Sequence, residues 1–353
     1  MSVATDAGLD TVATLRTLLD APSPTGDVAL ATRLLAELAT EAGYAAEIDP
    51  AGNVVMTWGD LSDGVRDSVL LLGHLDTVPG DIPVREVAGR LRGRGAVDAK
   101  GPLAAALVAV TRLPRSGAPI TVVAAPDEEG ASRGAAALCA RPAPRHLIVL
   151  EPSGWDTITV GYRGCVRLRV SLAQPAAHHA LPRPSAADRL VQVLSALRDE
   201  LSSPPDARSV EQVQTRVNAL SSVDDGLTER AGAAVEIRVP AGLSVLDVTR
   251  RVAEVATGAD ITIVSACDAV HVPRSNPAVR ELARSVTAAG GSPRYTVKTG
   301  TSDLNVVLPA WRCPAAVYGP GDCSLDHTGD EAIDLDELRT GASVLEQTLR
   351  SLR

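Results

Sequence analysis

Apolar residues in the first 160 positions alternate between helical spacing and short continuous runs. The helical spacing predicts helices over residues 10–19, 26–42 and 101–113. The continuous runs predict buried strands over residues 68–72, 120–125 and 146–150. This alternation of helices and strands is typical of an α/β domain.

The pattern changes near residue 164. The segments that follow predict, in order, a strand, a helix, two strands, a helix and a strand, at residues 166–173, 185–201, 213–220, 233–239, 244–256 and 261–265. This β-α-β-β-α-β order predicts a ferredoxin-like insert. Ser185 and Asp188 resemble a capping box at the start of its first helix.

The segments after the insert return to the first domain. They predict a helix, a strand and a last helix at residues 276–289, 315–318 and 334–352. We therefore expect one discontinuous domain, formed by residues 1–163 and 267–353, and an inserted domain formed by residues 164–266. A length of 353 residues also favours two compact units.

Composition narrows the classes of function. The chain has no Phe and a net charge of −9, so it lacks both the aromatic platforms and the surplus of basic residues that nucleic acids require. Its five cysteines are widely spaced without a C-x-x-C pair, which argues against a disulfide framework and a thiolate zinc site. With no signal-like start and no apolar run near ~18 residues, we expect a soluble, cytoplasmic protein without nucleic-acid or membrane partners.

Acidic and histidine residues follow the predicted strands, where α/β sheets collect their ligands: His74, Glu128, Glu129 and Glu151. His74 and Asp76 lie two residues apart at a strand end, so one could bind a metal while the other orients its imidazole. The adjacent Glu128 and Glu129 would repel each other unless a cation or solvent relieves them. A solvated loop is the alternative interpretation.

Two further segments supply candidate ligands. The glycine-rich segment GRGAVDAKG, from Gly93, delivers Asp98 just before a helix, and a loop near the C-terminus supplies His327. The glycine-rich segment lacks both G-x-G-x-x-G and the Gly-Lys-Ser/Thr order of a P-loop, which argues against a nucleotide site. Imidazoles, carboxylates and a nearby base are the groups that metal-dependent hydrolysis needs.

Together these motifs resemble the M20 family of metallopeptidases and amidohydrolases, which includes acetylornithine deacetylase, succinyl-diaminopimelate desuccinylase, aminoacylases and glutamate carboxypeptidases. The resemblance spans nearly the whole chain and rests on GHLDTVP from Gly73, GRGAVDAKG from Gly93, DEEG from Asp127, EPSG from Glu151 and the His327 loop. It implies a two-domain zinc-hydrolase fold, in which the insert is a lid and dimerisation domain.

The resemblance also implies the metal chemistry. Two zinc ions per subunit are expected, although nitrogen and oxygen ligands also accept Co²⁺ or Mn²⁺. Asp98 would bridge the two ions, His74 with Glu151 would complete one site, and Glu129 with His327 would complete the other. Glu128 would be the catalytic base, Asp76 would orient His74, and a cis peptide bond would follow Asp98.

The inserted domain carries further expectations from the resemblance. Its Ala177-His178 pair matches a motif that brings a histidine across a homodimer to the oxyanion, although the neighbouring His179 could take that place. Arg238 matches an arginine near substrate carboxylates, a role that suits a bidentate guanidinium; a structural role stays open for it.

The segment KTGTSDLN from Lys298, with EPSGWD and GYRG, resembles hydrolases that release lysine or ornithine from an acidic amino-group carrier protein. There the scissile bond is an isopeptide to the carrier's C-terminal glutamate, and Thr301 and Ser302 are the substrate contacts expected here. Two groups of arginines could steer such a partner or be solvated strand edges: Arg85, Arg90, Arg92 and Arg94, and Arg163, Arg167 and Arg169.

Asp224-Asp225 stands where many family members carry an asparagine, which puts the substrate-end contacts in doubt and makes a different amino acid plausible. The alternatives are a small-molecule deacylase of N-acyl amino acids such as acetylornithine or succinyl-diaminopimelate, a carboxypeptidase, and a non-catalytic binding protein on the same scaffold. Every expected ligand and the base are present, which disfavours the last of these.

Overall fold

The computed structural model describes residues 4–5, 8–60, 68–204 and 206–353. Contacts divide the chain into two compact units. Unit 1 comprises Met1–Val160, Val272–Thr296 and Ser302–Arg353, and unit 2 comprises Gly161–His271 and Val297–Thr301. The domain limits expected from the sequence, near residues 164 and 266, stay a prediction. Residues 1–10, in which no targeting signal is expected, lie partly outside the described residues.

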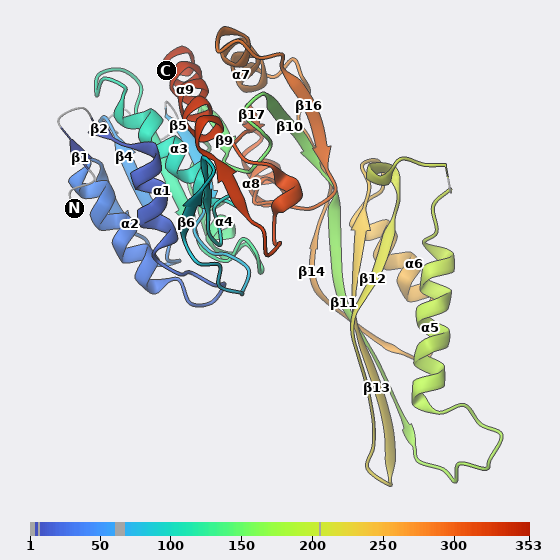
Figure 1. Ribbon diagram of the computed structural model, residues 1–353. Coiled ribbons are helices and arrows are strands. Elements are labelled where there is room, and N and C mark those ends of the chain that lie inside the picture. Colours follow the sequence, from blue (N-terminus) through green and yellow to red (C-terminus); the bar gives the residue numbers. More distant parts are fainter. Residues whose placement is uncertain (1–3, 6–7, 61–67, 205) are drawn as a thin grey trace. The chain divides into compact units, whose positions relative to one another are not determined.

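A mixed sheet forms the centre of unit 1 (Figure 1). Its strands run in the order β15-β10-β17-β9-β5-β8-β4-β3, and β16 also pairs with β10; β15 is Val270–His271 and β16 is Arg294–Lys298. The bounds of the other strands are Thr157–Tyr162 (β10), Ala315–Val317 (β17), His146–Val149 (β9), Val69–His74 (β5), Ile120–Ala125 (β8), Val54–Trp58 (β4) and Ala45–Ile48 (β3). Strand β5 is parallel to both β8 and β9. These three strands are buried along their whole length, as expected for apolar runs covered on both faces.

Helices flank this sheet: α1 (Thr11–Leu19), α2 (Ala29–Glu41), α3 (Lys100–Thr111), α4 (Arg133–Leu138), α7 (Pro277–Ala288), α8 (Leu304–Trp311) and α9 (Leu335–Leu352). Helix α3 is buried on all sides from Lys100 to Val110, because it contacts α1, α9 and the sheet. The helices and strands that the sequence predicts in unit 1 are confirmed, and α4 and α8 are additional. Among the described residues no helix combines the length and the apolar character that a membrane span requires.

Short strands complete the chain outside the central sheet. Strands β6 (Arg85–Val87), β7 (Arg90–Arg92) and β18 (Ala332–Asp334) form a small antiparallel sheet in the order β18-β7-β6. It places the segment before Asp98 beside the segment after His327, although the two are more than 200 residues apart in the sequence. The remaining elements are the strands β1 (Ala4–Thr5) and β2 (Gly8–Leu9), which pair with each other, and 3₁₀ turns at Ser209–Glu211 and Cys323–Leu325.

Unit 2 has the predicted β-α-β-β-α-β order. Its elements are β11 (Gly164–Pro175), α5 (Ala186–Glu200), β12 (Gln214–Asp224), β13 (Thr228–Val239), α6 (Val245–Val255) and β14 (Asp260–Cys267). The four strands form an antiparallel sheet in the order β12-β13-β11-β14. Alternate residues of β11 and β13, such as Leu168 and Ile237, pack with Leu190 and Leu197 of α5 in one core. The capping box of Ser185 and Asp188 is present at the start of α5.

Candidate metal centre

The carboxyl ends of three parallel strands bring the predicted ligands of unit 1 to one edge of the sheet. His74 is the last residue of β5, Glu151 follows β9 closely, and Glu129 lies in the loop after β8. Since β5 pairs in parallel with both β8 and β9, their ends meet at the same edge. This is the edge at which α/β sheets bind ligands.

Asp98 connects two groups of candidate ligands. Its Oδ1 lies 3.3 Å from Nε2 of His74, which is also 3.8 Å from Oε1 of Glu151. Its Oδ2 lies 3.0 Å from Nε2 of His327, which is also 2.9 Å from Oε1 of Glu129. In each group of three residues, all donor atoms lie within 4.8 Å of one another. One carboxylate therefore offers one oxygen to each of two adjacent sites.

The charges of these groups fit divalent cations. Hydrogen bonds that His327 donates to the carboxylates of Asp98 and Glu129 raise its pKa to about 10. Burial opposes protonation of His74, yet its hydrogen bond to Asp98 and the surrounding carboxylates raise its pKa well above the usual value. Clustered carboxylates repel one another, and a bound cation relieves that repulsion. Imidazole and carboxylate donors of this kind suit Zn²⁺, Co²⁺ or Mn²⁺.

Glu128 lies next to the ligand Glu129 at the same strand end. Burial raises the pKa of Glu128 well above its ordinary value, and the neighbouring carboxylate of Glu151 adds to this effect. A raised pKa makes the carboxylate a stronger base, which favours proton transfer from water. The arrangement is suited to a general base beside a metal centre.

The carboxylate of Asp76 holds the loop that carries Glu128 and Glu129. It is fully buried, and it accepts the backbone N–H groups of Glu128 and Glu129 at 3.1 and 3.3 Å and the Thr25 hydroxyl at 2.9 Å. Nδ1 of His74 lies 2.9 Å from the backbone oxygen of Asp76 and 3.7 Å from its Oδ1. The closer partner of the imidazole is thus the backbone of Asp76, while its side chain fixes the neighbouring loop.

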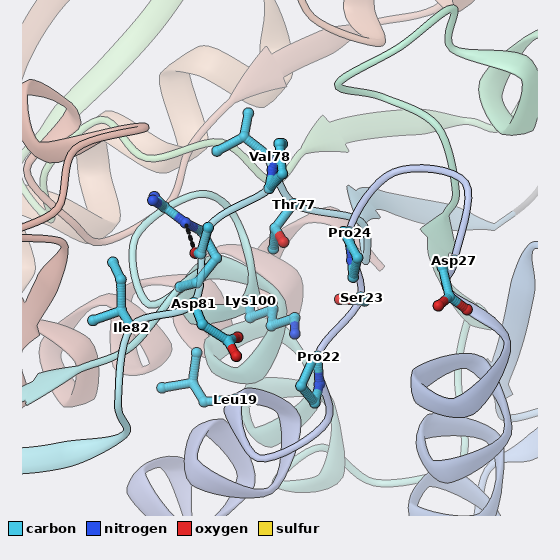
Figure 2. Close-up of a pocket in the computed structure, with 13 residues that line it drawn as sticks. Leu19, Pro22, Ser23, Pro24, Asp27, Thr77, Val78, Asp81, Ile82 and Lys100 are labelled. Atoms are coloured by element: carbon cyan, nitrogen blue, oxygen red, sulfur yellow. Dashed lines mark hydrogen bonds between the residues drawn. The ribbon is translucent and has the colours of Figure 1, made fainter.

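The turn before α3 aims Asp98 at both groups. The peptide bond between Asp98 and Ala99 is cis, in agreement with the expectation from the sequence. Lys100, 1% exposed, donates to the carbonyl oxygens of Leu18 and Ala21 at 3.0 and 2.9 Å, which fixes the start of α3 to the end of α1. Figure 2 shows this side chain in the wall of a pocket of about 420 Å³ that is lined also by Thr77 and Asp81.

The residues predicted to contact substrate lie outside these ligand groups. In unit 2, Nη1 of Arg238 donates to Oγ1 of Thr301 at 3.2 Å, and its Nη2 is 2.8 Å from Glu236. In unit 1, Ser302 is buried and its hydroxyl accepts the N–H of Leu304 at the start of α8. The hydroxyl of Ser302 is therefore engaged in supporting a helix.

His178 and the residues at Asp224 have local contacts within unit 2. His178 is exposed in the loop after β11, where its Nδ1 accepts the N–H of Ala180 at 3.2 Å. Asp225 accepts two N–H groups of the β12–β13 turn, and Arg230 lies 2.7 Å from it. That arginine, with the backbone donors, lowers the pKa of Asp225 to about 2. Asp225, which departs from the asparagine expected from the family pattern, thus stabilises the turn between β12 and β13.

Several of the arginines considered for steering have partners inside the protein. Arg94 lies 2.8 Å from Glu331, and Arg167 lies 3.0 Å from Glu236. Arg163 is buried and donates to the backbone oxygen of Thr299 at 2.7 Å. Their charges are therefore partly used in structural contacts. The sequence did not single out Glu331, which lies four residues after His327, because no motif marks its partners.

Comparisons with known proteins agree with this geometry. The chain is 37% identical to a "[LysW]-lysine hydrolase" of Deinococcus radiodurans over 96% of both chains. It is 30% identical to a "[LysW]-lysine/[LysW]-ornithine hydrolase" of Saccharolobus islandicus over 92% of this chain and 90% of that one. A metallo-carboxypeptidase of Sulfolobus solfataricus has the same fold, with a TM-score of 0.81 at 16% identity over 97% of this chain and 99% of that chain.

A family model described as peptidase family M20/M25/M40 matches residues 70–351. The matched segment contains the five candidate ligands, Glu128 and the whole of unit 2. The family is metal-dependent, in agreement with the two ligand groups that share Asp98. The chain is thus a member of peptidase family M20/M25/M40.

Proposed function

We propose that this protein is a di-zinc hydrolase that releases lysine, ornithine or a related amino acid from the C-terminal glutamate of an acidic amino-group carrier protein. The hydrolase function is supported by one observation: two groups of candidate metal ligands share Asp98, and Glu128 lies beside them. The carrier substrate is supported by near full-length similarity to relatives whose names contain LysW-lysine and LysW-ornithine.

In the proposed mechanism, each candidate residue at the carboxyl edge of the central sheet has a role. His74 and Glu151 would hold one zinc ion, Glu129 and His327 the other, and Asp98 both. When bound, zinc polarises an amide carbonyl and makes water more acidic. Glu128 would take the proton of the attacking water and transfer it to the nitrogen of the departing amino acid. Asp76 would keep Glu128 in place through the two backbone N–H groups that it accepts.

We further propose a cytoplasmic homodimer that associates through unit 2. Strand β12 is an edge strand of its sheet and exposes the large apolar side chains of Leu220 and Val223. An exposed apolar edge strand of this kind favours pairing with another chain. In such a dimer His178 would act on the oxyanion of the partner's site, and Arg238 with Thr301 would bind the carboxylate end of the substrate.

Substrate comparison tests the proposed function. Zinc-loaded protein would be offered lysine or ornithine conjugated to the carrier's C-terminal glutamate and, separately, acetylornithine and succinyl-diaminopimelate. We expect efficient release from the carrier conjugate, and we expect a strong chelator to abolish it until Zn²⁺, Co²⁺ or Mn²⁺ is returned. Efficient turnover of the small substrates alone would show that the protein is a small-molecule deacylase and not a hydrolase of carrier conjugates.

A further inference from the structure

Glu331 joins the loop that carries Asp98 to the loop that carries His327. Its side chain is 1% exposed. Oε1 accepts the backbone N–H groups of Val97 and Asp98 at 3.0 and 3.1 Å, and Oε2 accepts Nη1 of Arg94 at 2.8 Å. Burial of a carboxylate is costly unless it is paired and hydrogen-bonded, and here the three donors offset that cost.

Further hydrogen bonds tie the same two segments together. The N–H of Gly93 donates to the backbone oxygen of Glu331 at 3.3 Å. The guanidinium of Arg94 also donates to the backbone oxygen of Thr328, at 3.1 Å, and Arg92 donates to that of Gly329 at 2.6 Å. The residues that follow His327 are thus held directly against the residues that precede Asp98.

The two histidines of the centre differ in how they are held. His74 ends a buried strand and is 1% exposed, so the sheet itself fixes it. The side chain of His327 is 50% exposed, and its backbone has a φ of +62° in a loop. Its position relative to Asp98 therefore depends on contacts between the two loops, and Glu331 is the buried side chain that joins them.

We propose that Glu331 is a positioning residue that sets the affinity of the metal site formed by Asp98, Glu129 and His327. This inference rests on the proposed di-metal function. Loss of the carboxylate would free the N–H groups of Val97 and Asp98 and loosen the His327 loop, while His74 and Glu151 would keep their strand-end positions. Partners behind metal ligands commonly change metal affinity by about 10–100-fold, and we expect a change of that size at this site.

Metal titration of two matched variants tests the proposal. Glu331→Ala removes the contacts with the ligand loop. Glu337→Ala is the control, because Oε1 of Glu337 also accepts two backbone N–H groups, from Trp155 and Gly321 at 3.1 and 3.0 Å, but none from a ligand. Metal-free proteins would be titrated with Co²⁺ against a competing chromophoric chelator, and thermal unfolding of each metal-free variant would be measured in parallel.

We expect Glu331→Ala to bind the second Co²⁺ about 10–100-fold more weakly than the wild type and the first with a smaller loss, because Asp98 serves both sites, while Glu337→Ala binds both normally. Glu331→Asp keeps the charge, but its side chain is too short to reach all three donors. We therefore expect a smaller loss of affinity at the same site. This variant tests the proposal if the alanine variant does not fold.

Unchanged affinities in folded Glu331 variants, equal losses at both sites, or the same loss in Glu337→Ala would overturn the positioning role. A wild type that binds no metal would instead refute the proposed function. The two failures are therefore distinguishable.

Discussion

Polar residues occupy different positions in the sheets of the two units. In unit 1, strands β5, β8 and β9 are parallel and buried throughout, so polar side chains gather only where the strands end. In unit 2, the antiparallel strand β11 alternates buried residues with more exposed ones, and Arg167 and Arg169 lie on the face opposite the helices. A sheet covered on both faces concentrates its chemistry at one edge, whereas a sheet covered on one face spreads polar groups along its length.

This difference indicates how each unit responds to substitution. At the edge in unit 1, the carboxylates of Asp76 and Glu331 accept backbone N–H groups of the loops that carry candidate ligands, and His327 contacts two carboxylates at once, so a single change disturbs several groups together. In unit 2, charged side chains pair with one another along the strands, for example Glu236 with both Arg167 and Arg238. We therefore expect substitutions in unit 1 to reduce the rate of the reaction and those in unit 2 to affect binding and stability.

The largest effect should come from Glu128→Ala. Removal of the proposed base leaves the ligands in place, so turnover should fall by ~10² or more while metal content is unchanged. Steady-state kinetics on the carrier conjugate, together with metal analysis of the purified variant, measure both quantities. Unchanged turnover would remove Glu128 from the mechanism, and loss of the metal would show that it acts as a ligand.

Asp76→Asn should have the next largest effect. An asparagine has one oxygen for the two backbone N–H groups of Glu128 and Glu129, so its amide would face one of them and displace the loop. We expect a loss of about 10–100-fold in kcat/KM. Thr25→Val, which removes the contacts of this hydroxyl with Asp76 and with the backbone oxygen of Thr77 but keeps the two N–H contacts, is the control and should cost about 1 kcal/mol or less of transition-state stabilisation. Equal losses in both variants would contradict the role of the two N–H groups.

Arg238→Ala should weaken binding more than catalysis. If this side chain holds a substrate carboxylate, its loss removes a charge-assisted hydrogen bond, and KM should rise about 10-fold with a smaller change in kcat. Arg230→Ala, on the same strand but paired with Asp225 at the hairpin, is the matched control and should leave KM unchanged. A fall in kcat alone would place Arg238 in the chemical step and narrow the contrast between the two units.

The smallest effect concerns the start of helix α5. The hydroxyl and N–H of Ser185 lower the pKa of Asp188, so Asp188 stabilises the folded state above its unfolded pKa of about 4, and this contribution is lost as the pH falls through the folded pKa. Asp188→Asn should therefore lower the midpoint of thermal unfolding at pH 7, and its difference from the wild type should shrink as the pH falls below about 4. Thermal unfolding followed by circular dichroism between pH 7 and acidic pH measures this gap, the difference in midpoint between variant and wild type. A gap that persists at low pH would mean that the charge of Asp188 is not its cause.

Local sequence patterns account for most elements and for the identity of the ligand candidates. The apolar runs before His74 and Glu151 predict buried strands on their own, and the capping box at Ser185 is a signal within four residues. Elements with weak local patterns were missed, among them β3, β4 and the small sheet of β6, β7 and β18. These strands are short or depend on partners far away in the sequence.

Taken alone, the sequence determined which side chains are available for metal chemistry, because each lies in a short motif whose residues are neighbours in the chain. Only the tertiary structure decided that one oxygen of Asp98 faces His74 and the other His327. The tertiary structure also showed that the side chain of Asp76 accepts the N–H of Glu128. It showed that Glu331 accepts the N–H of Asp98, more than 200 residues away in the sequence. Such contacts depend on strand pairing and on the direction of individual N–H groups, which the order of residues does not reveal until the chain is folded.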